Sequence, residues 1–565
     1  MCGKMTRRAF LSAGAVSAGI VGAWSASNLR GTNAQTSTTD YSSLALDDSA
    51  WQYDSDNDIY YQLGVQYCLS PAAPAIESMG IYVPGAYLNA TANSDGSTYT
   101  CEVNEDGKVG SYTAKDAPIA MPVTTNGYAP QNPPTSYSSD DVKTYTAAGM
   151  VYVLAGCRGR SNGTNSDGSE YDGGAPWGVT DLKAAIRCLR HNGDSLPGST
   201  DRIFIFGVSA GGAQSVVVAS TGDAAEYDPY LQSIGAVTED GSSDAVCGVA
   251  CWCPVTSLDS GNEAYEWMMG QFSTDDTRAE GTWTRALSQD MAREFVSYIN
   301  GSDIEDADGN RLTLSEGGEG IYTSGSYYDQ MLSTVEGSLD NFLVDTSFPY
   351  TTDDATYNDA QAYVESLNSD EKWVTYDASS NTATVSGIGA FVRHCKPPTK
   401  VVAAFDAPDK SAMENLLMGD HDQDARHFDA TMADLMEDNA STYSSLSGYD
   451  SSYASDWSSD IQTKDALGTE QAVRLNMYSP LFYLCPSGDG YGTSTVAPNW
   501  RIRSGITQGE TSLATELNLA LVLAHNSSVS NLDFQTVWAQ GHTVAERTGD
   551  HTQNLISWIA SCLSS

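Results

Sequence analysis

The sequence predicts an α/β fold built on a mostly parallel, doubly wound sheet. Apolar runs of strand length alternate with stretches in which apolar residues recur at helical spacing. This alternation stops in the middle of the chain and returns near its end, which indicates one sheet interrupted by an insertion. An apolar content of 41%, with 31 Tyr, 12 Phe and 11 Trp, is typical of a packed globular protein.

The first part of the sheet is predicted between residues 79 and 257. Runs of apolar residues predict strands, and the amphipathic stretch 175–193, with a glycine after its last turn, predicts a helix. The strands are expected within 79–88, 117–125, 147–160, 201–206 and 245–257. The second part is expected as strand, helix, strand and terminal helix within 500–510, 511–526, 532–542 and 552–563.

The chain between these two parts has a different composition. It is rich in Asp, Ser and Tyr, helix-like and irregular. Because a domain can be interrupted at an exposed loop, we predict a main domain formed by 58–257 and 474–565. Residues 258–473 are then a large, mainly helical insertion that covers it as a lid.

The N-terminus is expected to lie outside the fold. Two arginines precede a short apolar run that is too short and too rich in small residues for a membrane span. This pattern resembles a twin-arginine signal, so residues 1–34 are predicted to engage the twin-arginine (Tat) export machinery, followed by a polar linker at 35–57. The mature protein is then extracellular, periplasmic or on the cell surface, with no stable membrane insertion. Whether the signal is cleaved stays open.

The charge and the cysteines limit the partners further. Asp and Glu number 72 against 28 Lys and Arg, giving a net charge of −44 that repels nucleic acid and anionic lipid. Eleven cysteines are present, and with Cys2 in the signal, an oxidising compartment makes some disulfides expected, without indicating their pairing.

Residues Gly207 to Gly211 carry the clearest chemical pattern. They fit G-x-S-x-G, with Ser209 at its centre, directly after a buried strand and at the start of a helix. This context is that of a nucleophile elbow, in which small neighbours are needed because the turn is crowded and strained. The alternative is an ordinary strand-to-helix corner.

A serine needs a base and an acid to act as a nucleophile. His542 follows the last predicted strand, where α/β-hydrolases carry their histidine, whereas His551 opens the terminal helix. The acid is expected in the loop after residue 500. Glu510 is our prediction, because Gln508 stands at the usual offset and cannot be an anion. The order serine, acid, histidine fits an α/β-hydrolase.

The oxyanion of such a reaction needs two N–H donors. One is predicted to be the backbone of Ala210. The other is predicted in the loop after the strand in 147–160, at Gly156, Cys157 or Arg158. Arg158 is also a candidate substrate contact, and its alternative is a structural arginine that pairs with acidic residues.

Six motifs in the same order resemble the bacterial subtype B tannase-like esterases, which are α/β-hydrolases with a large lid and relatives of feruloyl esterases. The motifs are AGCRGR, VTDLKAAIRCLR, GVSAGG, VVAAFDAPDKSAMENLLMG, RIRSGITQGET and QGHTVAE. The resemblance covers the chain from about residue 78 to its end, except the middle of the insertion.

The resemblance also implies a set of substrate-binding residues. In that family a lid lysine and a glutamate fourteen residues later contact galloyl hydroxyls, together with an acidic residue beside the catalytic aspartate. Lys400 and Glu414 have this spacing, and Glu510 falls on the acidic neighbour. Gln508 occupies the aspartate's own position, so this chain departs from the family there, and we count Gln508 among the candidate substrate contacts. The alternative for Lys400 and Glu414 is a salt bridge within the lid.

These observations predict an exported serine ester hydrolase that acts through an acyl-enzyme on aromatic or phenolic esters and needs no cofactor. The Asp- and His-rich stretch 419–438 lacks compact ligand spacing, so no metal is expected. Two alternatives remain: a general carboxylesterase or serine peptidase on the same fold, and a non-catalytic binding protein that keeps the hydrolase shell. The particular ester and the oligomeric state cannot be predicted from the sequence.

Overall fold

The computed structural model describes residues 39–239 and 241–564. The predicted signal at 1–34 lies outside these residues. The chain divides after Ser43, and the unit that begins at Leu44 contains all the elements described below.

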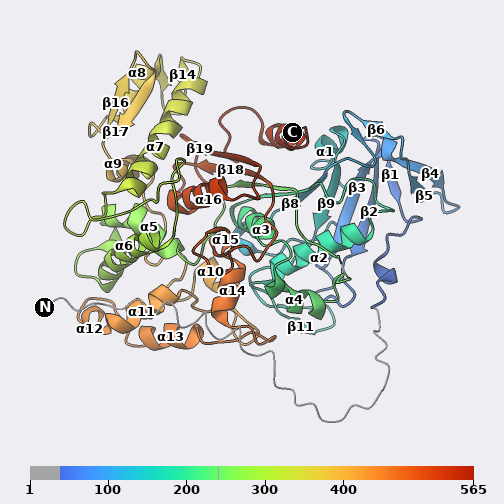
Figure 1. Ribbon diagram of the computed structural model, residues 1–565, viewed down its shortest axis with the longest axis horizontal. Helices are drawn as coiled ribbons and strands as arrows, with labels where there is room; N and C mark the ends of the chain where they lie inside the picture. Colours follow the sequence, from blue (N-terminus) through green and yellow to red (C-terminus); the bar gives the residue numbers. More distant parts are fainter. Residues whose placement is uncertain (1–38, 240, 565) are drawn as a thin grey trace, which may run out of the picture. The chain divides into compact units, whose positions relative to one another are not determined.

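One mixed sheet forms the centre of this unit (Figure 1). The pairings β1–β2, β2–β3 and β3–β9 are antiparallel, and all later pairs are parallel. Across the sheet, the nine strands follow the order β1 (Gln52–Asp54), β2 (Ile59–Gln66), β3 (Ser78–Pro84), β9 (Val151–Ala155), β8 (Ile119–Val123), β12 (Ile203–Val208), β13 (Gly248–Trp252), β18 (Asn499–Gly505) and β19 (Asn531–Val537).

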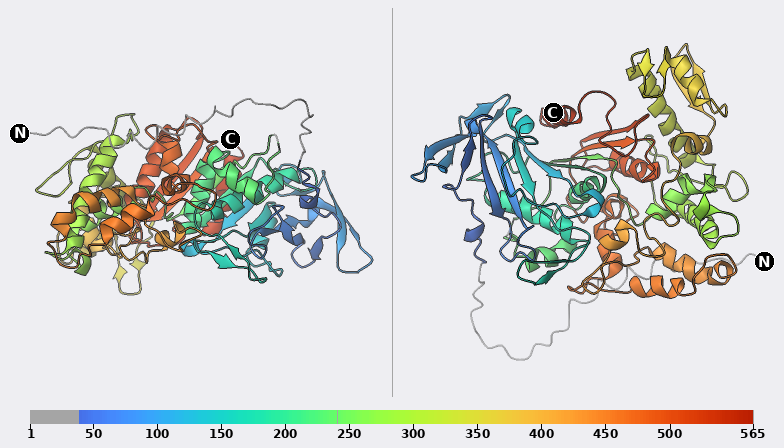
Figure 2. Two further views of the ribbon diagram at one scale, coloured as in Figure 1. Left: turned by 90° about the horizontal axis from the view of Figure 1, so that it is seen from below. Right: turned by 180° about the vertical axis from the view of Figure 1, so that it is seen from behind.

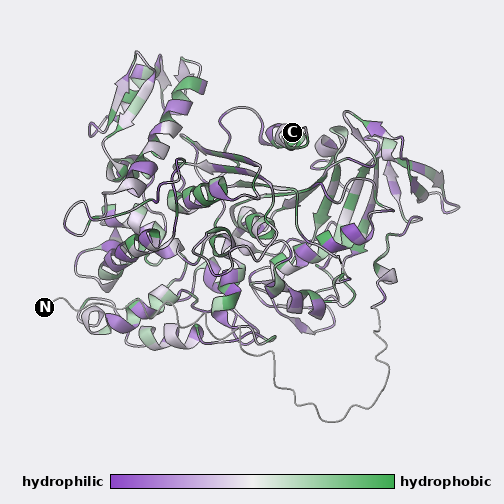
Figure 3. Ribbon diagram, in the orientation of Figure 1, coloured by the Kyte–Doolittle hydropathy of each residue, from purple (hydrophilic) through white to green (hydrophobic). Residues whose placement is uncertain are grey.

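Helices cover both faces of the sheet (Figure 1), as the doubly wound prediction requires. One face packs against α1 (Lys143–Ala147) and α17 (His551–Cys562), where Phe204 and Trp252 join Trp558 in an apolar core. The other face carries α2 (Trp177–His191), α3 (Ser209–Ser220) and α16 (Leu513–His525). Central strands such as β8, β12 and β13 are largely apolar (Figure 3), because both of their faces are covered.

The insertion between β13 and β18 is mainly helical, as predicted. In the described part of the chain, residues 258–473 add no strand to the central sheet and form only the hairpins β14–β15 (Tyr350–Thr351, Thr356–Tyr357) and β16–β17 (Val374–Asp377, Thr382–Val385). Its helices are α5 (Gly261–Met268), α6 (Trp283–Gly301), α7 (Ser326–Asp345), α8 (Ala360–Leu367), α9 (Ile388–Cys395), α10 (Met413–Leu417), α11 (Ala430–Asp438), α12 (Ala440–Tyr443), α13 (Tyr453–Asp460) and α14 (Gln471–Met477). Most of them lie toward the β19 edge of the sheet, opposite β1 (Figure 2), while α10 contacts the turn Asn126–Tyr128 that follows β8.

Short elements complete the chain. They are the hairpins β4–β5 (Leu88–Ala92, Tyr99–Val103), β6–β7 (Lys108–Val109, Tyr112–Thr113) and β10–β11 (Gly163–Thr164, Glu170–Tyr171), and the helices α4 (Asp228–Ser233) and α15 (Pro480–Leu484). No helix among the described residues has the length and apolar character needed to cross a membrane.

Two expectations differ from this structure. The predicted linker 35–57 contains β1, because Trp51 is buried and the following residues pair with β2. The expected disulfides are not found at the buried cysteines, which are free thiols: Cys68, Cys101, Cys157, Cys188, Cys251, Cys253 and Cys485.

Candidate active site

Ser209 lies at a sharp turn between β12 and α3. Its φ angle of 58° is in the left-handed region, which few residues other than glycine adopt. Gly207 and Gly211 make this turn possible. A Cβ on Gly207 would lie 2.5 Å from the Val123 carbonyl oxygen of β8, and one on Gly211 would lie 2.2 Å from the same oxygen. We call this strained, glycine-lined turn the elbow; its geometry matches the tight strand-to-helix turn that the sequence predicts.

His542 lies in the loop after β19, and Gln508 holds it. The His542 Nδ1 is 2.7 Å from the Gln508 side-chain oxygen Oε1. Our prediction that Glu510 makes this contact is therefore wrong. The loop after β18 is tied to the loop after β19 by two hydrogen bonds from Thr507, through its N–H and its hydroxyl, to the Gln540 carbonyl. This tie directs Gln508 toward the imidazole.

Glu510 acts on His542 through charge. Although the imidazole reaches solvent, partial burial lowers the pKa of His542 below its ordinary value, the Glu510 carboxylate raises it, and the Lys400 and Lys396 ammonium groups lower it. The dominant effect is desolvation, which disfavours the charged imidazolium. The shift favours the neutral form of the His542 imidazole.

Lys400 and Glu414 form an ion pair, which is the alternative that the sequence left open for them. The Lys400 Nζ lies 3.7 Å from Glu414 Oε1 and 4.3 Å from the centre of the Phe405 ring. Burial raises the pKa of Glu414, the Lys400 ammonium opposes this, and the Glu510 carboxylate adds to it. Lys400 and Glu414, both from the insertion, thus lie within electrostatic reach of Glu510 and of the His542 region.

Arg158 is a structural arginine, so our prediction of a substrate contact is wrong. Its guanidinium is buried, donates to both carboxylate oxygens of Asp181 at 2.9 and 2.7 Å, and stacks 4.2 Å above the Trp177 ring. Arg160 is the arginine that reaches the site. It donates to the Gly127 carbonyl, and its charge lowers the pKa of Glu414.

The predicted oxyanion donors after β9 are also wrong. The N–H groups of Gly156 and Cys157 donate to the carbonyls of Ser78 and Gln131, and that of Arg158 donates to Asp181. The reason is the strand order: β8, not β9, lies beside β12, with Val123 paired to Gly207. The segment after β8, Thr124–Tyr128, therefore borders the elbow, while Ala210 keeps its predicted place at the start of α3.

Three residues near His542 were missed by the sequence analysis. The Cys253 sulfur lies 3.8 and 3.4 Å from the carbonyl oxygens of Gly541 and Thr543, the two neighbours of His542. Buried Lys396 donates to the Gln508 carbonyl, and burial lowers the pKa of Lys396 to about 8. Buried Glu516 accepts from the Gln508 side chain. Their positions depend on how distant loops fold together, which no local pattern indicates.

The histidines of the stretch 419–438 have structural partners. The buried His427 Nδ1 lies 2.6 Å from Asp406 Oδ1, and its ring stacks on Trp457 at 3.6 Å. His421 contacts Asp172 at 2.8 Å. Each histidine therefore joins a carboxylate rather than the other histidine.

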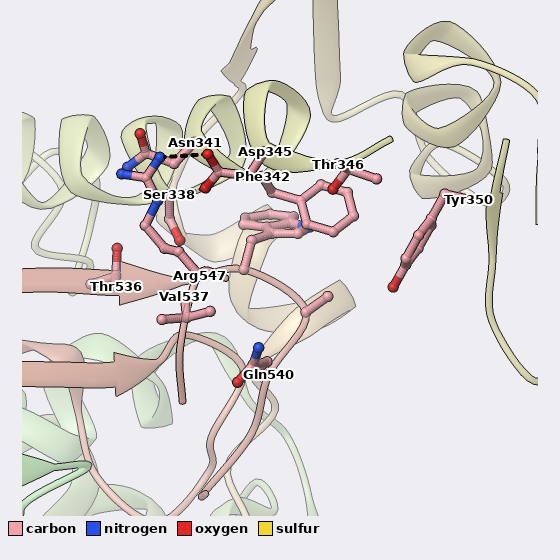
Figure 4. A pocket seen from close by; sticks show the side chains of 12 residues that line it. Ser338, Asn341, Phe342, Asp345, Thr346, Tyr350, Thr536, Val537, Gln540 and Arg547 are labelled. Carbon is pink, nitrogen blue, oxygen red and sulfur yellow. Dashed lines mark hydrogen bonds and ion pairs between the residues drawn. The ribbon is translucent and has the colours of Figure 1, made fainter. Parts of the chain in front are cut away.

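A cavity of about 220 Å³ lies between α7 and the end of β19 (Figure 4). Phe342, Tyr350 and Trp538 line it, together with the ion pair of Arg547 and Asp345. None of the predicted site residues lines this cavity, which is therefore separate from the site at Ser209 and His542.

Comparison with known proteins gives structural relatives only. No family model matches the sequence, and no curated protein matches it. The structure is similar to the tannin acyl hydrolase from Lactobacillus plantarum, with a TM-score of 0.68 and 25% identity over 92% of this chain and 98% of that one. A tannin acyl hydrolase in complex with ethyl gallate matches with a TM-score of 0.65 and 26% identity over 92% and 98%. The tannase of Fusobacterium nucleatum matches with a TM-score of 0.66 and 25% identity over 89% and 95%.

Proposed function

We propose that this chain, an ester hydrolase that is tannase-like in structure over most of its length, is a serine enzyme that cleaves esters of aromatic or phenolic acids. The observation that carries the proposal is the joint position of a strained serine turn after β12 and a histidine loop after β19, with the histidine held at Nδ1. These are the parts of a nucleophile and its base.

The sheet supports assignment to the α/β-hydrolase fold. The antiparallel pairings are confined to one end of the sheet, from β1 through β2 and β3 to β9. From β9 onward all pairs are parallel, and β8 lies between β9 and β12 although it precedes β9 in sequence. Ser209 and His542 follow β12 and β19, each at the carboxyl end of a parallel strand. Ligands of open α/β sheets bind at this edge.

In the proposed reaction, Ser209 Oγ attacks the ester carbonyl while His542 takes its proton at Nε2. The Nδ1–H remains bonded to Gln508, which fixes the imidazole in the required tautomer. The tetrahedral oxyanion is stabilised by the N–H of Ala210 and by an N–H from the segment Thr124–Tyr128. Collapse expels the alcohol, which takes the proton from His542, and leaves an acyl-enzyme. Water, activated by the same histidine, then releases the acid.

Phenolic esters are the favoured substrate class. Phenolic hydroxyls donate strongly to carboxylates, and Glu414 and Glu510 are carboxylates close to Lys400 and His542. The relatives include tannin acyl hydrolases in complex with ethyl gallate and with 3,4-dihydroxybenzoate. The insertion that carries Lys400 and Glu414 acts as the lid of the site and forms its acyl pocket.

The site of action is outside the cytoplasm. We base this on the twin-arginine pattern at residues 1–34 and on the strongly acidic composition, with a net charge of −44. The substrate is then a small ester that reaches the cell from its surroundings. A test is the location of the full chain in cells with and without a working twin-arginine system.

Hydrolysis of methyl gallate, methyl ferulate and p-nitrophenyl acetate tests the function. We expect turnover of at least one phenolic ester, lost in Ser209→Ala and retained in Ser215→Ala, a buried serine of the same helix that donates to the Gly211 carbonyl. Activity on the acetate alone leaves an esterase without phenolic preference. No Ser209-dependent activity on any ester overturns the proposal in favour of a peptidase or a binding protein.

A further inference from the structure

Glu516 of α16 is a fully buried carboxyl surrounded by hydrogen-bond donors. Its Oε1 accepts from Gln508 Nε2 at 2.8 Å, from Ser504 Oγ at 3.0 Å and from Thr511 Oγ1 at 3.2 Å. Its Oε2 lies 2.8 Å from Thr515 Oγ1, whose hydroxyl proton is shared with the Ser512 carbonyl oxygen at 2.9 Å.

The three donors that converge on Oε1 favour an oxygen without a proton, as in a carboxylate. An amide nitrogen can only donate, and Ser504 Oγ already accepts a hydrogen bond from Gln508 Nε2 at 3.1 Å, so its own proton is directed to Glu516. Burial raises the pKa of Glu516 above its ordinary value, while the buried ammonium of Lys396 and the hydrogen bonds from Thr515 and Ser504 act against this rise. The remaining titratable groups that face this region are the thiols of Cys251 and Cys253, together with Glu510.

These contacts fix the orientation of the Gln508 amide. Because Nε2 faces Glu516 and Ser504, Oε1 faces His542, and an amide oxygen can only accept. His542 must therefore carry its proton at Nδ1. In the neutral imidazole this leaves Nε2 free to accept the proton of Ser209.

We propose that Glu516 is the anion of the site and acts on His542 through the Gln508 amide. It replaces, from a greater distance, the aspartate that the family resemblance leads one to expect at position 508. This inference rests on the proposed function. The proton of Ser209 moves to His542 Nε2 and later to the leaving alcohol, while Gln508 and Glu516 keep their protonation throughout. Glu516 is thus a positioning residue. Through the Gln508 amide it keeps His542 in the tautomer protonated at Nδ1 and stabilises the imidazolium that forms during the reaction.

Glu516→Gln is the first test. An amide at 516 can present either its oxygen or its nitrogen, so Gln508 loses its fixed orientation and part of the population places an N–H group at His542. We expect kcat for p-nitrophenyl acetate to fall about 10- to 100-fold with little change in KM, since a wrong tautomer in a serine triad costs up to ~10⁴-fold. A folded Glu516→Gln enzyme with more than half of the native kcat overturns the proposal.

The isosteric exchange Gln508→Glu with Glu516→Gln is the second test. It keeps one carboxylate and one amide but moves the anion next to His542. An adjacent anion raises the pKa of a histidine, typically by about one unit or more. We expect kcat to be at least tenfold higher than in Glu516→Gln. The acid limb of the pH profile, where kcat/KM falls as His542 becomes protonated, should move to higher pH. A folded double variant without this recovery or without the shift contradicts the inference.

Asp244→Asn is the matched control. Asp244 is a buried carboxylate held by Lys183 at 2.6 Å and Arg187 at 2.7 Å, away from His542. Its loss lowers the melting temperature without moving the acid limb. Should no variant at 516 fold, Gln508→Met keeps Glu516 and its hydroxyl donors. If this variant has a native melting temperature and kcat is reduced at least tenfold, the action of Glu516 on His542 through Gln508 is supported. If kcat is native, the proposal is overturned.

Ser209→Ala separates the two failures. If ester hydrolysis depends on Ser209 but not on Glu516, only the proposed role of Glu516 is wrong. If hydrolysis does not depend on Ser209, the proposed function itself fails.

Discussion

The Lys400 ammonium lies 3.7 Å from Glu414 Oε1, while Glu414 Oε2 is buried and has no hydrogen-bond partner among the described residues. An open acceptor beside a cation matches a phenolic hydroxyl, which is a strong donor. A buried acceptor without a partner is costly, and a bound phenol would remove that cost.

Glu414→Gln should therefore reduce phenolic selectivity. A hydrogen bond to a charged group is worth about 1.5–3 kcal/mol, so we expect kcat/KM for methyl gallate to fall about tenfold or more. The value for p-nitrophenyl acetate, which has no phenolic hydroxyl on its acyl group, should change less than threefold. Glu371→Gln, an exposed carboxylate paired with Arg393 at 3.2 Å, is the control and should change neither. Equal losses on both esters would argue against a phenol contact.

The pH profile should report His542. A protonated imidazole cannot accept the serine proton, so kcat/KM falls as the pH drops through the pKa of His542. Because burial lowers that pKa from its ordinary value of 6.5, the acid limb should lie below pH 6.5.

Two charge variants test the direction in which neighbouring charges shift the pKa of His542. Lys400→Met removes a cation that lowers the pKa of His542, so the acid limb should move to higher pH. Glu510→Gln removes an anion that raises the pKa, so the limb should move to lower pH. Each shift is expected to be roughly half a unit to one unit. Shifts in the same direction for both variants would contradict the assignment of the limb to His542.

The elbow should not tolerate a side chain at Gly211. A Cβ there would lie 2.2 Å from the Val123 carbonyl oxygen and 2.9 Å from its carbon, so β8 and α3 would have to separate. We expect Gly211→Ala to lower kcat about 100-fold, the cost of misplacing a reacting group by about 1 Å. Gly337→Ala on α7, where a Cβ meets nothing within 4 Å, should leave kcat unchanged. Esterase assays with thermal unfolding check both variants.

Asp406 is expected to anchor the insertion. Five donors converge on its carboxylate: His427 Nδ1 at 2.6 Å, Asn415 Nδ2 at 2.7 Å, Trp457 Nε1 at 2.9 Å, and the N–H groups of Phe428 and Asp429 at 3.0 Å. Asp406→Ala leaves these buried donors without an acceptor, and a cost of about 3–5 kcal/mol is expected. Thermal unfolding should show a loss of about 5 °C or more.

The control for this prediction is Asp434→Ala. Asp434 is an exposed residue of α11, and its replacement should move the melting temperature by no more than about 1 °C. If Asp406→Ala unfolds at the native temperature, the network does not stabilise the insertion.

The serine turn and the alternation of strands and helices were predictable because they are local. G-x-S-x-G after an apolar run requires small residues where β8 crowds the turn, and Val123 supplies that crowding. The ion pair of Lys400 and Glu414 was also among the expectations, as the alternative to substrate contact. In each case the physical cause lies in a few neighbouring residues or in a motif with fixed spacing.

The errors arose where strand order decides which loops meet. The segment after β9 was chosen for the oxyanion donors, but β8 lies between β9 and β12. Likewise, Glu510 was chosen because it is an anion, whereas the hydrogen bonds from Thr507 to Gln540 direct Gln508 toward His542. Burial of Arg158 against Asp181 is a further tertiary effect that composition does not indicate.

Covalent trapping of Ser209 tests the central claim most directly. The protein would be treated with a p-nitrophenyl phosphonate, and p-nitrophenol release and the modified residue would be measured, the latter by peptide mass spectrometry. We predict one equivalent of p-nitrophenol and one adduct on Ser209, absent in Ser209→Ala and at least about 100-fold slower in His542→Ala. An adduct on another residue, or none while ester hydrolysis continues, would contradict the account.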